Sequence, residues 1–406
     1  MFIFVFSLLR TAFPFSIYEG LARRVRFLRD SAISIPTVLA GMGHIRAFQA
    51  IEKALREISG NVEVKGTDPL DYYSPKVPEL INQLYLWMIK SPLRGLWGAL
   101  YESNIISSVH SPFRWLITQI YARAIHESLK DSPQVIVSTH PFITLGAASL
   151  KREGILKTPL VYVATDFDVH PLGINEEVDI FVVPDISIGM KLKEMGVPEE
   201  KIKVLGIPID PIFSKEISKM ELRQKLGLGE TQPTVLIIGG GFGIGPIEKL
   251  VSSFKNFKKP LQLLVVVGKN EELKQRIEKM EKDLGIEIEV FGYIENIDEL
   301  MGASDLVITK PGGLTIAEAL AKNLPFILIE PVGGQEEKNL EFAIEKGVAI
   351  YAKQIEEIPK IIGELFENPS QLELMRVQAK KLAHPNSARE IAMLLLELTA
   401  QKKKEN

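Results

Sequence analysis

Short apolar runs alternate with helix-patterned stretches along most of the chain. One series of runs lies at residues 35–40, 135–138, 160–163 and 179–183, and a second at residues 234–238, 263–267, 288–291, 306–308 and 326–329. Between the first two runs, residues 47–58 carry apolar positions at helical spacing. Short runs of this kind are typical of parallel strands that are buried on both faces.

The two series predict an α/β protein with two doubly wound, Rossmann-like domains, in which ligands bind at the carboxyl ends of the strands. Two prolines within residues 206–213 mark a linker between the series. We therefore expect a first domain over residues 34–212 and a second over residues 213–375. An extension over residues 1–33 would precede them, and a C-terminal helix over residues 376–406 could pack back on the first domain.

Composition narrows the classes of function. The 406 residues carry a net charge of -3, which makes nucleic acid a poor partner. The chain has no cysteine, so disulfides, thiol nucleophiles and cysteine-bound zinc are excluded, and a reducing cytoplasm is the expected compartment. No stretch reaches the roughly 20 continuous apolar residues of a spanning helix.

Two segments combine apolar or aromatic residues with basic ones. Residues 1–29 begin with nine apolar or small residues and then carry five arginines, which suggests an amphipathic anchor on an anionic membrane surface. Trp87, Trp97 and Trp115 lie in a second such segment, which suits a membrane interface. Ordinary helix packing explains either segment equally well, and the extension could also be a frayed tail.

Gly41-Met42-Gly43-His44 follows the first predicted strand. Glycines allow a tight turn and a close approach to a ligand, and the start of the next helix offers unpaired N–H groups. His44 would lie at the mouth of a cleft, where an imidazole can accept a proton at neutral pH. The alternative for His44 is a capping or packing role.

A glycine-rich loop follows the first strand of the second series and contains Gly240, Gly241, Phe242 and Gly243. Pro246 stands where the dinucleotide-binding pattern requires its third glycine, which disfavours a Rossmann oxidoreductase. The phosphate-loop pattern of nucleotide triphosphatases is also absent. A loop that faces a diphosphate or an acceptor remains the prediction.

A Pro-Gly-Gly turn follows the run at 306–308. Thr315 and Glu318 have the spacing of a capping box, which is the structural explanation of this motif. In the functional explanation, the exposed helix start binds a phosphate and Glu318 accepts hydrogen bonds from vicinal ribose hydroxyls. The next predicted turn carries Gln335, Glu336 and Asn339, a polar cluster suited to a sugar ring or to a solvated helix start.

Together these motifs resemble the GT-B glycosyltransferases over residues 36–375. The resemblance is greatest to the branch of monogalactosyldiacylglycerol synthases, processive diacylglycerol glucosyltransferases and the MurG-type transferase. Six ordered segments carry it, at residues 41–44, 165–170, 206–211, 240–243, 310–313 and 334–336. The aromatic segment favours the diacylglycerol branch.

The resemblance implies an inverting transfer of a hexose from a UDP-sugar to a lipid such as diacylglycerol, at the inner face of the cell membrane. It makes His44, Asp166 and His170 catalytic, with His44 or Asp166 as the base. It places Gly43, Trp87, Trp97 and Trp115 on the acceptor side. It assigns the donor to Gly240, Gly241, Phe242, Gly243, Tyr293, Ile294, Pro311, Gly312, Gly313, Thr315, Glu318, Gln335, Glu336 and Asn339. The base pocket would form through the backbone around Tyr293.

No metal or other cofactor is expected, although Asp166-Phe167-Asp168 has the spacing of a metal-binding carboxylate pair. One departure bears on the acceptor. Relatives often place a tryptophan soon after the histidine that matches His170, where this chain has Pro171-Leu172-Gly173. The remaining alternatives are a UDP-N-acetylglucosamine enzyme of the same fold, either a MurG-like transferase or a 2-epimerase, and a non-catalytic nucleotide-sugar-binding protein.

Overall fold

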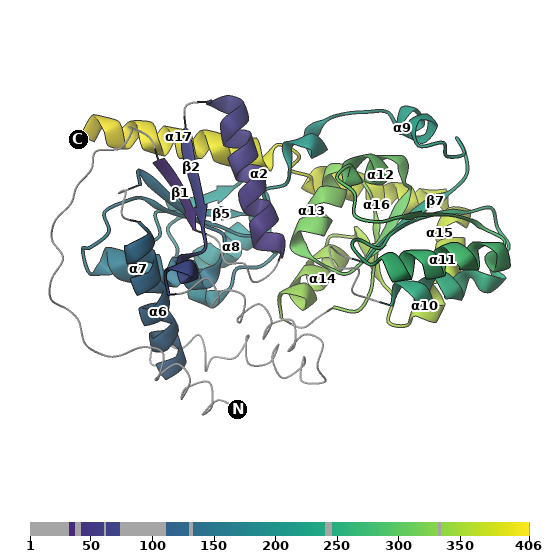
Figure 1. Ribbon diagram of the computed structural model, residues 1–406, viewed down its shortest axis with the longest axis horizontal. Helices are drawn as coiled ribbons and strands as arrows, with labels where there is room; N and C mark the ends of the chain where they lie inside the picture. Colours follow the sequence, from purple (N-terminus) through teal and green to yellow (C-terminus); the bar gives the residue numbers. More distant parts are fainter. Residues whose placement is uncertain are drawn as a thin grey trace. The chain divides into compact units, whose positions relative to one another are not determined.

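Two parallel six-stranded sheets organise the chain (Figure 1). The computed structural model describes residues 32–36, 42–60, 62–73, 111–129, 133–239, 246–331 and 334–405, and residues 31–406 form one unit. The candidate anchor in residues 1–31, Trp87, Trp97 and the loop from Gly240 to Gly243 lie outside the described residues.

The first sheet has the strand order β2-β1-β3-β4-β5-β6. Its strands are β1 (Ala32–Pro36), β2 (Glu63–Thr67), β3 (Val135–Ser138), β4 (Leu160–Val163), β5 (Ile180–Val183) and β6 (Ile202–Val204). Its helices are α2 (Met42–Ile58), η1 (Pro69–Tyr72), α6 (Pro112–Ser128), α7 (Pro141–Arg152), η2 (Pro171–Gly173), α8 (Ile186–Glu194) and η3 (Glu199–Lys201). We call this part, together with the C-terminal helix, the first lobe.

The second sheet has the strand order β12-β11-β10-β7-β8-β9. Its strands are β7 (Thr234–Ile238), β8 (Gln262–Val266), β9 (Glu287–Phe291), β10 (Leu306–Thr309), β11 (Phe326–Leu328) and β12 (Ala349–Tyr351). The helices around it are α9 (Lys219–Lys225), α10 (Ile247–Ser252), η5 (Ser253–Asn256), α11 (Glu271–Leu284), α12 (Ile297–Ala303), α13 (Gly313–Ala321), α14 (Gln335–Glu345), η6 (Ile355–Glu357), α15 (Ile358–Glu367) and α16 (Pro369–Leu382). We call this part the second lobe.

Both sheets are buried on both faces, as the continuous apolar runs predict. In β3, Val135 and Val137 pack in one cluster with α2 and the C-terminal helix, and Ile136 packs in another with α6 and α7. In the second lobe, Leu236 of β7 and its neighbour Val235 likewise belong to clusters on opposite faces. The predicted α/β class and doubly wound topology are confirmed.

Strand order reverses at two places, between β1 and β3 and between β7 and β10. Ligands of doubly wound sheets bind outside the carboxyl ends of the strands at such points. His44 follows β1, and the turn from Pro311 to Gly313 follows β10. Two of the predicted motifs therefore lie at the positions that this topology offers to ligands.

Element boundaries near the first motif differ from the prediction. The first strand is described over Ala32–Pro36, where its pairing with β2 and the burial of Ile33 fix its register. It therefore begins earlier than the predicted run at residues 35–40, whose last four residues lie outside the described residues. Helix α2 begins at Met42 rather than near residue 47, so Gly43 and His44 lie in its first turn and not in a loop. The short edge strands β2, β6 and β12 were not predicted. Strands β2 and β6 have no continuous apolar run, whereas β12 lies in one, at residues 348–352.

The chain passes between the lobes twice, and the two passages lie against each other. Gly206 has φ +85°, and a Cβ there would lie 2.3 Å from Cβ of His384, so this position requires glycine. Ser387 donates its hydroxyl to the carbonyl oxygen of Ile207 at 2.7 Å. Together, residues near 206–210 and 384–387 form the joint between the lobes.

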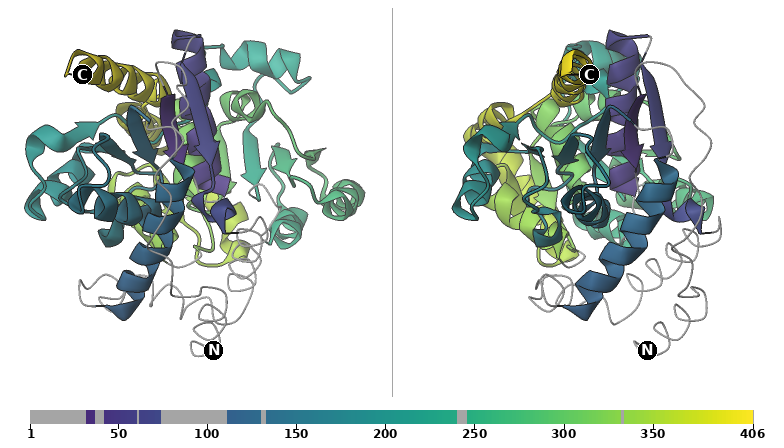
Figure 2. Two further views of the ribbon diagram at one scale, coloured as in Figure 1. Left: turned by 60° about the vertical axis from the view of Figure 1, so that its left-hand side comes forward. Right: turned by 90° about the vertical axis from the view of Figure 1, so that its left-hand side faces the viewer.

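Helix α17 (Ser387–Glu405) packs against α2 and the first sheet, and the views in Figures 1 and 2 agree on this. Its residues Ala388, Ile391, Ala392 and Leu395 are buried in the same cluster as Ile33. Helix α16, in contrast, packs on α13 and α15 of the second lobe. The expected boundary at residue 376 therefore lies inside α16, and the chain returns to the first lobe after residue 382.

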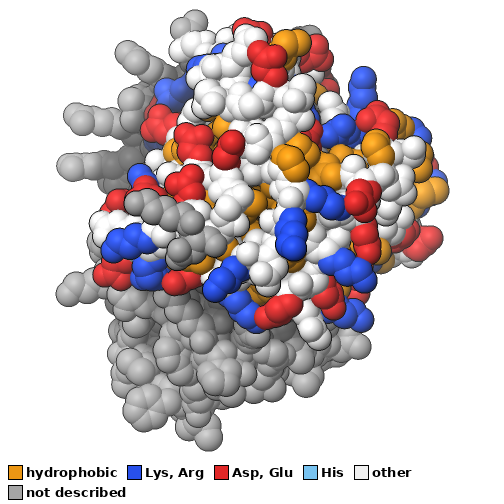
Figure 3. Space-filling view, turned by 90° about the vertical axis from the view of Figure 1, so that its right-hand side faces the viewer, with side chains coloured by type: hydrophobic (Ala, Val, Ile, Leu, Met, Phe, Trp, Pro, Cys, Tyr) orange, Lys and Arg blue, Asp and Glu red, His pale blue; other side chains and the backbone are white. Residues whose placement is uncertain are grey.

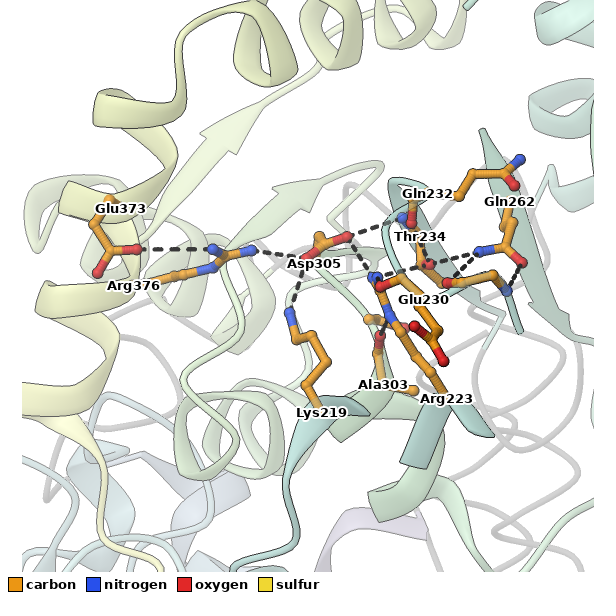
Figure 4. A network of polar contacts seen from close by, with 12 residues as sticks. Lys219, Arg223, Glu230, Gln232, Thr234, Gln262, Ala303, Asp305, Glu373 and Arg376 are labelled. Atoms are coloured by element: carbon orange, nitrogen blue, oxygen red, sulfur yellow. Dashed lines mark hydrogen bonds and ion pairs between the residues drawn. The ribbon is translucent and has the colours of Figure 1, made fainter. Parts of the chain in front are cut away.

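A charged network anchors α9 and α16 to the second sheet (Figure 4). Asp305, just before β10, accepts hydrogen bonds from Lys219 at 2.8 Å, Arg223 at 2.8 Å and Arg376 at 2.9 Å. Burial alone would raise the pKa of Asp305, but the charge of Lys219 and the hydrogen bonds outweigh it and hold the pKa below its ordinary value. Asp305 precedes its strand, so the network lies away from the carboxyl ends of the strands.

Figure 3 shows one face of the second lobe, where Lys and Arg side chains are interspersed with Asp and Glu. No described helix is both long enough and apolar enough to cross a bilayer.

Candidate active site

His44 lies in the first turn of α2, beside the end of β4. Its Nδ1 lies 3.2 Å from Oγ1 of Thr165. Burial lowers the pKa of His44, and the charge of Asp166 and a hydrogen bond with the backbone of Thr139 oppose this shift only in part. His44 is therefore neutral at pH 7 and can accept a proton, while Asp166 would stabilise the imidazolium that results.

Asp166 is half-buried in the segment that follows β4. The Thr165 hydroxyl donates to its Oδ2 at 3.4 Å, and the Asn339 side-chain amide of α14 donates to its Oδ1 at 2.9 Å. Asp166 thus lies between a residue that contacts His44 and a residue of the second lobe. The structure brings His44 and Asp166 together, as the resemblance implies.

Two further histidines border this pair. His140 caps α7 and His170 caps η2, each by accepting a backbone N–H through Nδ1 at 3.2 Å. The rings of His140 and His44 meet edge to face, with centroids 4.7 Å apart. Burial lowers the pKa of His140 far below its ordinary value, and His44 and His170 lower it further.

His140 was not predicted, although its position directly after a buried strand was a usable signal. His170 has a capping role here, and its proposed part in catalysis stays a prediction.

A pocket of about 270 Å³ lies at this place, lined by residues of both lobes. The first lobe contributes His44, Asp166 and His170, and α14 contributes Gln335 and Lys338. All three predicted catalytic residues therefore share one pocket with a residue predicted to bind the sugar. The volume is close to that of a small ligand site.

The Pro-Gly-Gly turn leads into α13, whose first residue is Gly313 and whose N-cap is Gly312. No side chain caps this helix, so the capping-box explanation of Thr315 and Glu318 is wrong. Thr315 is the third residue of the helix, and the backbone N–H groups of a first helical turn have no partner within the helix and can bind an anion. The Pro311 carbonyl accepts a hydrogen bond from Asn339 at 2.9 Å.

Glu318 is 2% exposed and forms an ion pair with Arg46 of α2 across the lobes. Burial raises the pKa of Glu318 to about 7, the charge of Arg46 opposes this, and Asp210 and Asp298 add to it. Arg46 was not predicted as a site residue, because its role depends on the approach of α2 to α13 (Figure 1). Its position two residues after His44 was the only hint.

The three polar residues of α14 differ in their surroundings. Gln335 lines the pocket and Glu336 is half-buried beside it in the sequence. Asn339 is fully buried and bonds to Phe167, Asp166 and Pro311 within the protein. The predicted contact of these three residues with a sugar stays a prediction.

The remaining predicted positions lie apart from the pocket. Tyr293 is 63% exposed, with the Lys269 ammonium 5.6 Å from its ring centre, and Ile294 packs on the core of the second lobe. Trp115 is 55% exposed on α6. Gly43 lies in α2 close to Leu314 of α13.

Asp168 lines the same pocket as Asp166, but its carboxylate pairs with Lys191 of α8 at 2.5 Å. Among the residues that the structure describes, no group of three or more histidines and carboxylates could hold a metal ion.

Comparisons with known proteins identify the family. The model for monogalactosyldiacylglycerol synthase matches residues 44–209, and the model for the glycosyltransferase family 28 C-terminal domain matches residues 234–391. A processive diacylglycerol beta-glucosyltransferase of Bacillus cytotoxicus is 31% identical over 91% of this chain and 94% of its own. The chain belongs to the glycosyltransferase family of monogalactosyldiacylglycerol synthases and processive diacylglycerol glucosyltransferases.

Monogalactosyldiacylglycerol synthase 1 of Arabidopsis thaliana is 32% identical to the chain, covering 89% of this chain and 70% of its own. The crystal structure of MurG from Acinetobacter baumannii covers 90% of this chain and 99% of its own, with a TM-score of 0.60 and 18% identity. It supports the GT-B fold of this glycosyltransferase and no more than the fold. The predicted family, fold and enzyme class are confirmed.

Proposed function

We propose that this glycosyltransferase moves a hexose from a UDP-sugar to the free hydroxyl of a diacylglycerol-type lipid, with inversion at the anomeric carbon. The observation that carries the proposal is near-full-length similarity to enzymes named for diacylglycerol glycosylation. The pocket between the lobes supports it, because it combines a proton acceptor, His44, with the polar start of α14.

In the proposed reaction, the acceptor oxygen attacks the anomeric carbon while the bond from that carbon to the diphosphate breaks. The acceptor proton passes to His44, and the electron pair of the broken bond leaves with UDP. Asp166 stabilises the charged imidazole. General-base catalysis of this kind contributes roughly 10²–10⁴-fold in rate.

The donor would bind at the place where the strand order of the second sheet reverses, between β7 and β10. The first turn of α13, with Gly312, Gly313 and Thr315, would face the diphosphate and stabilise the charge that develops on it. Glu318 would accept the ribose hydroxyls, and Gln335 and Glu336 the sugar hydroxyls. We further propose that these helix termini take the place of a metal ion.

The acceptor lies in a bilayer and the donor is soluble, so the protein must work at a membrane surface. We propose the inner face of the cell membrane, with an anionic lipid surface as a partner. The exposed Trp115 on α6 suits such a surface. Flotation with anionic vesicles tests this, and a protein that stays in the dense fraction would contradict it.

The function is tested by incubating the protein with a panel of UDP-hexoses and UDP-N-acetylglucosamine, with and without diacylglycerol vesicles. We expect UDP release with at least one donor that depends on the vesicles, and a glycolipid product. His44→Gln should lower the rate roughly 10²-fold or more. His126→Gln, at an exposed histidine of α6, should not. Release without any lipid product would refute the proposed transfer.

A further inference from the structure

Asn339 uses its whole side-chain amide for contacts within the protein, two of which cross between the lobes. It lies in α14 and is fully buried. Its two N–H groups bond to Oδ1 of Asp166 and to the carbonyl oxygen of Pro311, both at 2.9 Å, and its oxygen accepts the N–H of Phe167 at 2.7 Å. An amide side chain offers two N–H donors and one carbonyl oxygen, so both donors and the oxygen of Asn339 already form hydrogen bonds within the protein.

The same three-residue segment, Thr165 to Phe167, is held at two more points by the second lobe. The Phe167 ring stacks on Phe342, one turn along α14, with centroids 4.4 Å apart and planes at 20°. A Cβ at Gly313 would lie 2.2 Å from the carbonyl oxygen of Thr165 and 2.9 Å from Cα of Asp166. Both helices of the candidate donor site therefore touch this segment.

The segment in turn contacts His44. Thr165 places its hydroxyl 3.2 Å from Nδ1 of His44 and 3.4 Å from Oδ2 of Asp166. The other oxygen of Asp166 is the one that Asn339 binds. A continuous path of contacts thus runs from α14, through Asp166 and Thr165, to the imidazole.

We propose that Asn339 is a positioning residue through which the second lobe aligns the His44–Asp166 pair, so that the base is complete only when the two lobes are closed. The proposal rests on the function proposed above. It gives Asn339 a role other than contact with the sugar. It also explains how an enzyme of this geometry would limit donor hydrolysis, because an open cleft that admits water would lack an aligned base.

The two roles of Asn339 predict different kinetics. If Asn339 aligns the base, Asn339→Ala should lower kcat about 10-fold or more and change the KM for the donor and the Kd for UDP less than about threefold. If it instead binds the sugar, the KM for the UDP-sugar should rise. Asn339→Asp places a carboxylate against Asp166 and the Pro311 carbonyl, and should lower kcat further.

Asp166→Ala provides the decisive comparison. Without the Asp166 carboxylate there is little left to align, so adding Asn339→Ala should lower kcat by less than about twofold. If the double variant loses kcat by the product of the two single-variant losses, the proposal is overturned. Glu345→Ala, at an exposed residue of the same helix, is the matched control and should leave kcat unchanged.

Asn339→Ala could unfold the protein, so each variant is checked by thermal unfolding and by UDP binding. Phe342→Leu loosens the same segment without touching a buried amide, and should also lower kcat with UDP binding intact. If Phe342→Leu keeps the full kcat and folded Asn339 variants change only KM, the inference fails while the function stands. If the wild-type protein transfers no hexose, the proposed function itself fails.

Discussion

Glu318 gives the sharpest test of the electrostatics at the junction of the lobes. It is almost completely buried, and its carboxylate pairs with Arg46. The negative charges of Asp210 and Asp298 repel it and raise its pKa. Burial raises its pKa from the ordinary 4.5 to about 7. In the folded protein it therefore takes up a proton at a higher pH than in the unfolded chain.

The sign of the effect on stability follows from this difference in proton uptake. The protonated form is favoured by folding, so its contribution is fully present below about pH 4.5 and is lost as the pH rises through about 7. Each pH unit between those values corresponds to about 1.4 kcal/mol, which gives about 3 kcal/mol in total. Glu318→Gln keeps the shape of the side chain and does not titrate.

We predict that the free energy of unfolding of the wild type, relative to Glu318→Gln, falls by about 3 kcal/mol between about pH 4.5 and pH 8. Urea unfolding of both proteins across this range, followed by circular dichroism, measures the difference and cancels the other titrating groups. Glu345→Gln, which removes an exposed carboxylate, is the matched control. If the difference in free energy of unfolding between the wild type and Glu318→Gln does not change with pH, the pKa of Glu318 is not raised by folding.

Four further results are expected. Burial lowers the pKa of His44 and the charge of Asp166 raises it, so Asp166→Asn should move the acidic limb of kcat/KM that His44 sets to lower pH; an unmoved limb would contradict this. Gly313→Ala should lower the free energy of unfolding by about 1–3 kcal/mol, because the new Cβ would meet the carbonyl oxygen of Thr165. Gly312→Ala, whose nearest new contact is at 3.9 Å, should lower it by less than about 1 kcal/mol; equal losses in thermal unfolding would count against the close approach of Gly313 to Thr165. Asp305→Asn should cost about 3 kcal/mol or more in urea unfolding at pH 7, and because the pKa of Asp305 is held low, this contribution should fade as the pH drops below about 4; an unchanged midpoint would contradict it. Transfer should persist in EDTA, and loss of activity that Mg²⁺ restores would overturn the proposed role of the helix termini.

Strong local signals made most of the fold predictable. Runs such as residues 135–138 and 160–163 match β3 and β4 because strands buried on both faces need continuous apolar residues. The edge strands β2 and β6 were missed because their own sequences carry no continuous apolar run, and the run at β12 was overlooked. The start of the first strand was misplaced because its register depends on pairing with β2.

At the site, positions at the ends of predicted strands could be found and contacts between the lobes could not. His44 and Asp166 were identified from motifs, and the structure places them together. The pairing of Arg46 with Glu318 and the commitment of Asn339 to Asp166 join residues more than 170 positions apart in the chain. Such contacts depend on how the lobes pack, which no local pattern encodes.

In the proposed reaction a hexose passes to a diacylglycerol-type lipid, with His44 as the base. The most direct measurement is mass spectrometry of the lipids after incubation with UDP-glucose or UDP-galactose and diacylglycerol vesicles, comparing the wild type with His44→Gln. We expect a hexosylated diacylglycerol from the wild type and roughly 10²-fold less from the variant. A lipid fraction that stays unmodified with every donor, or equal product from both proteins, would contradict it.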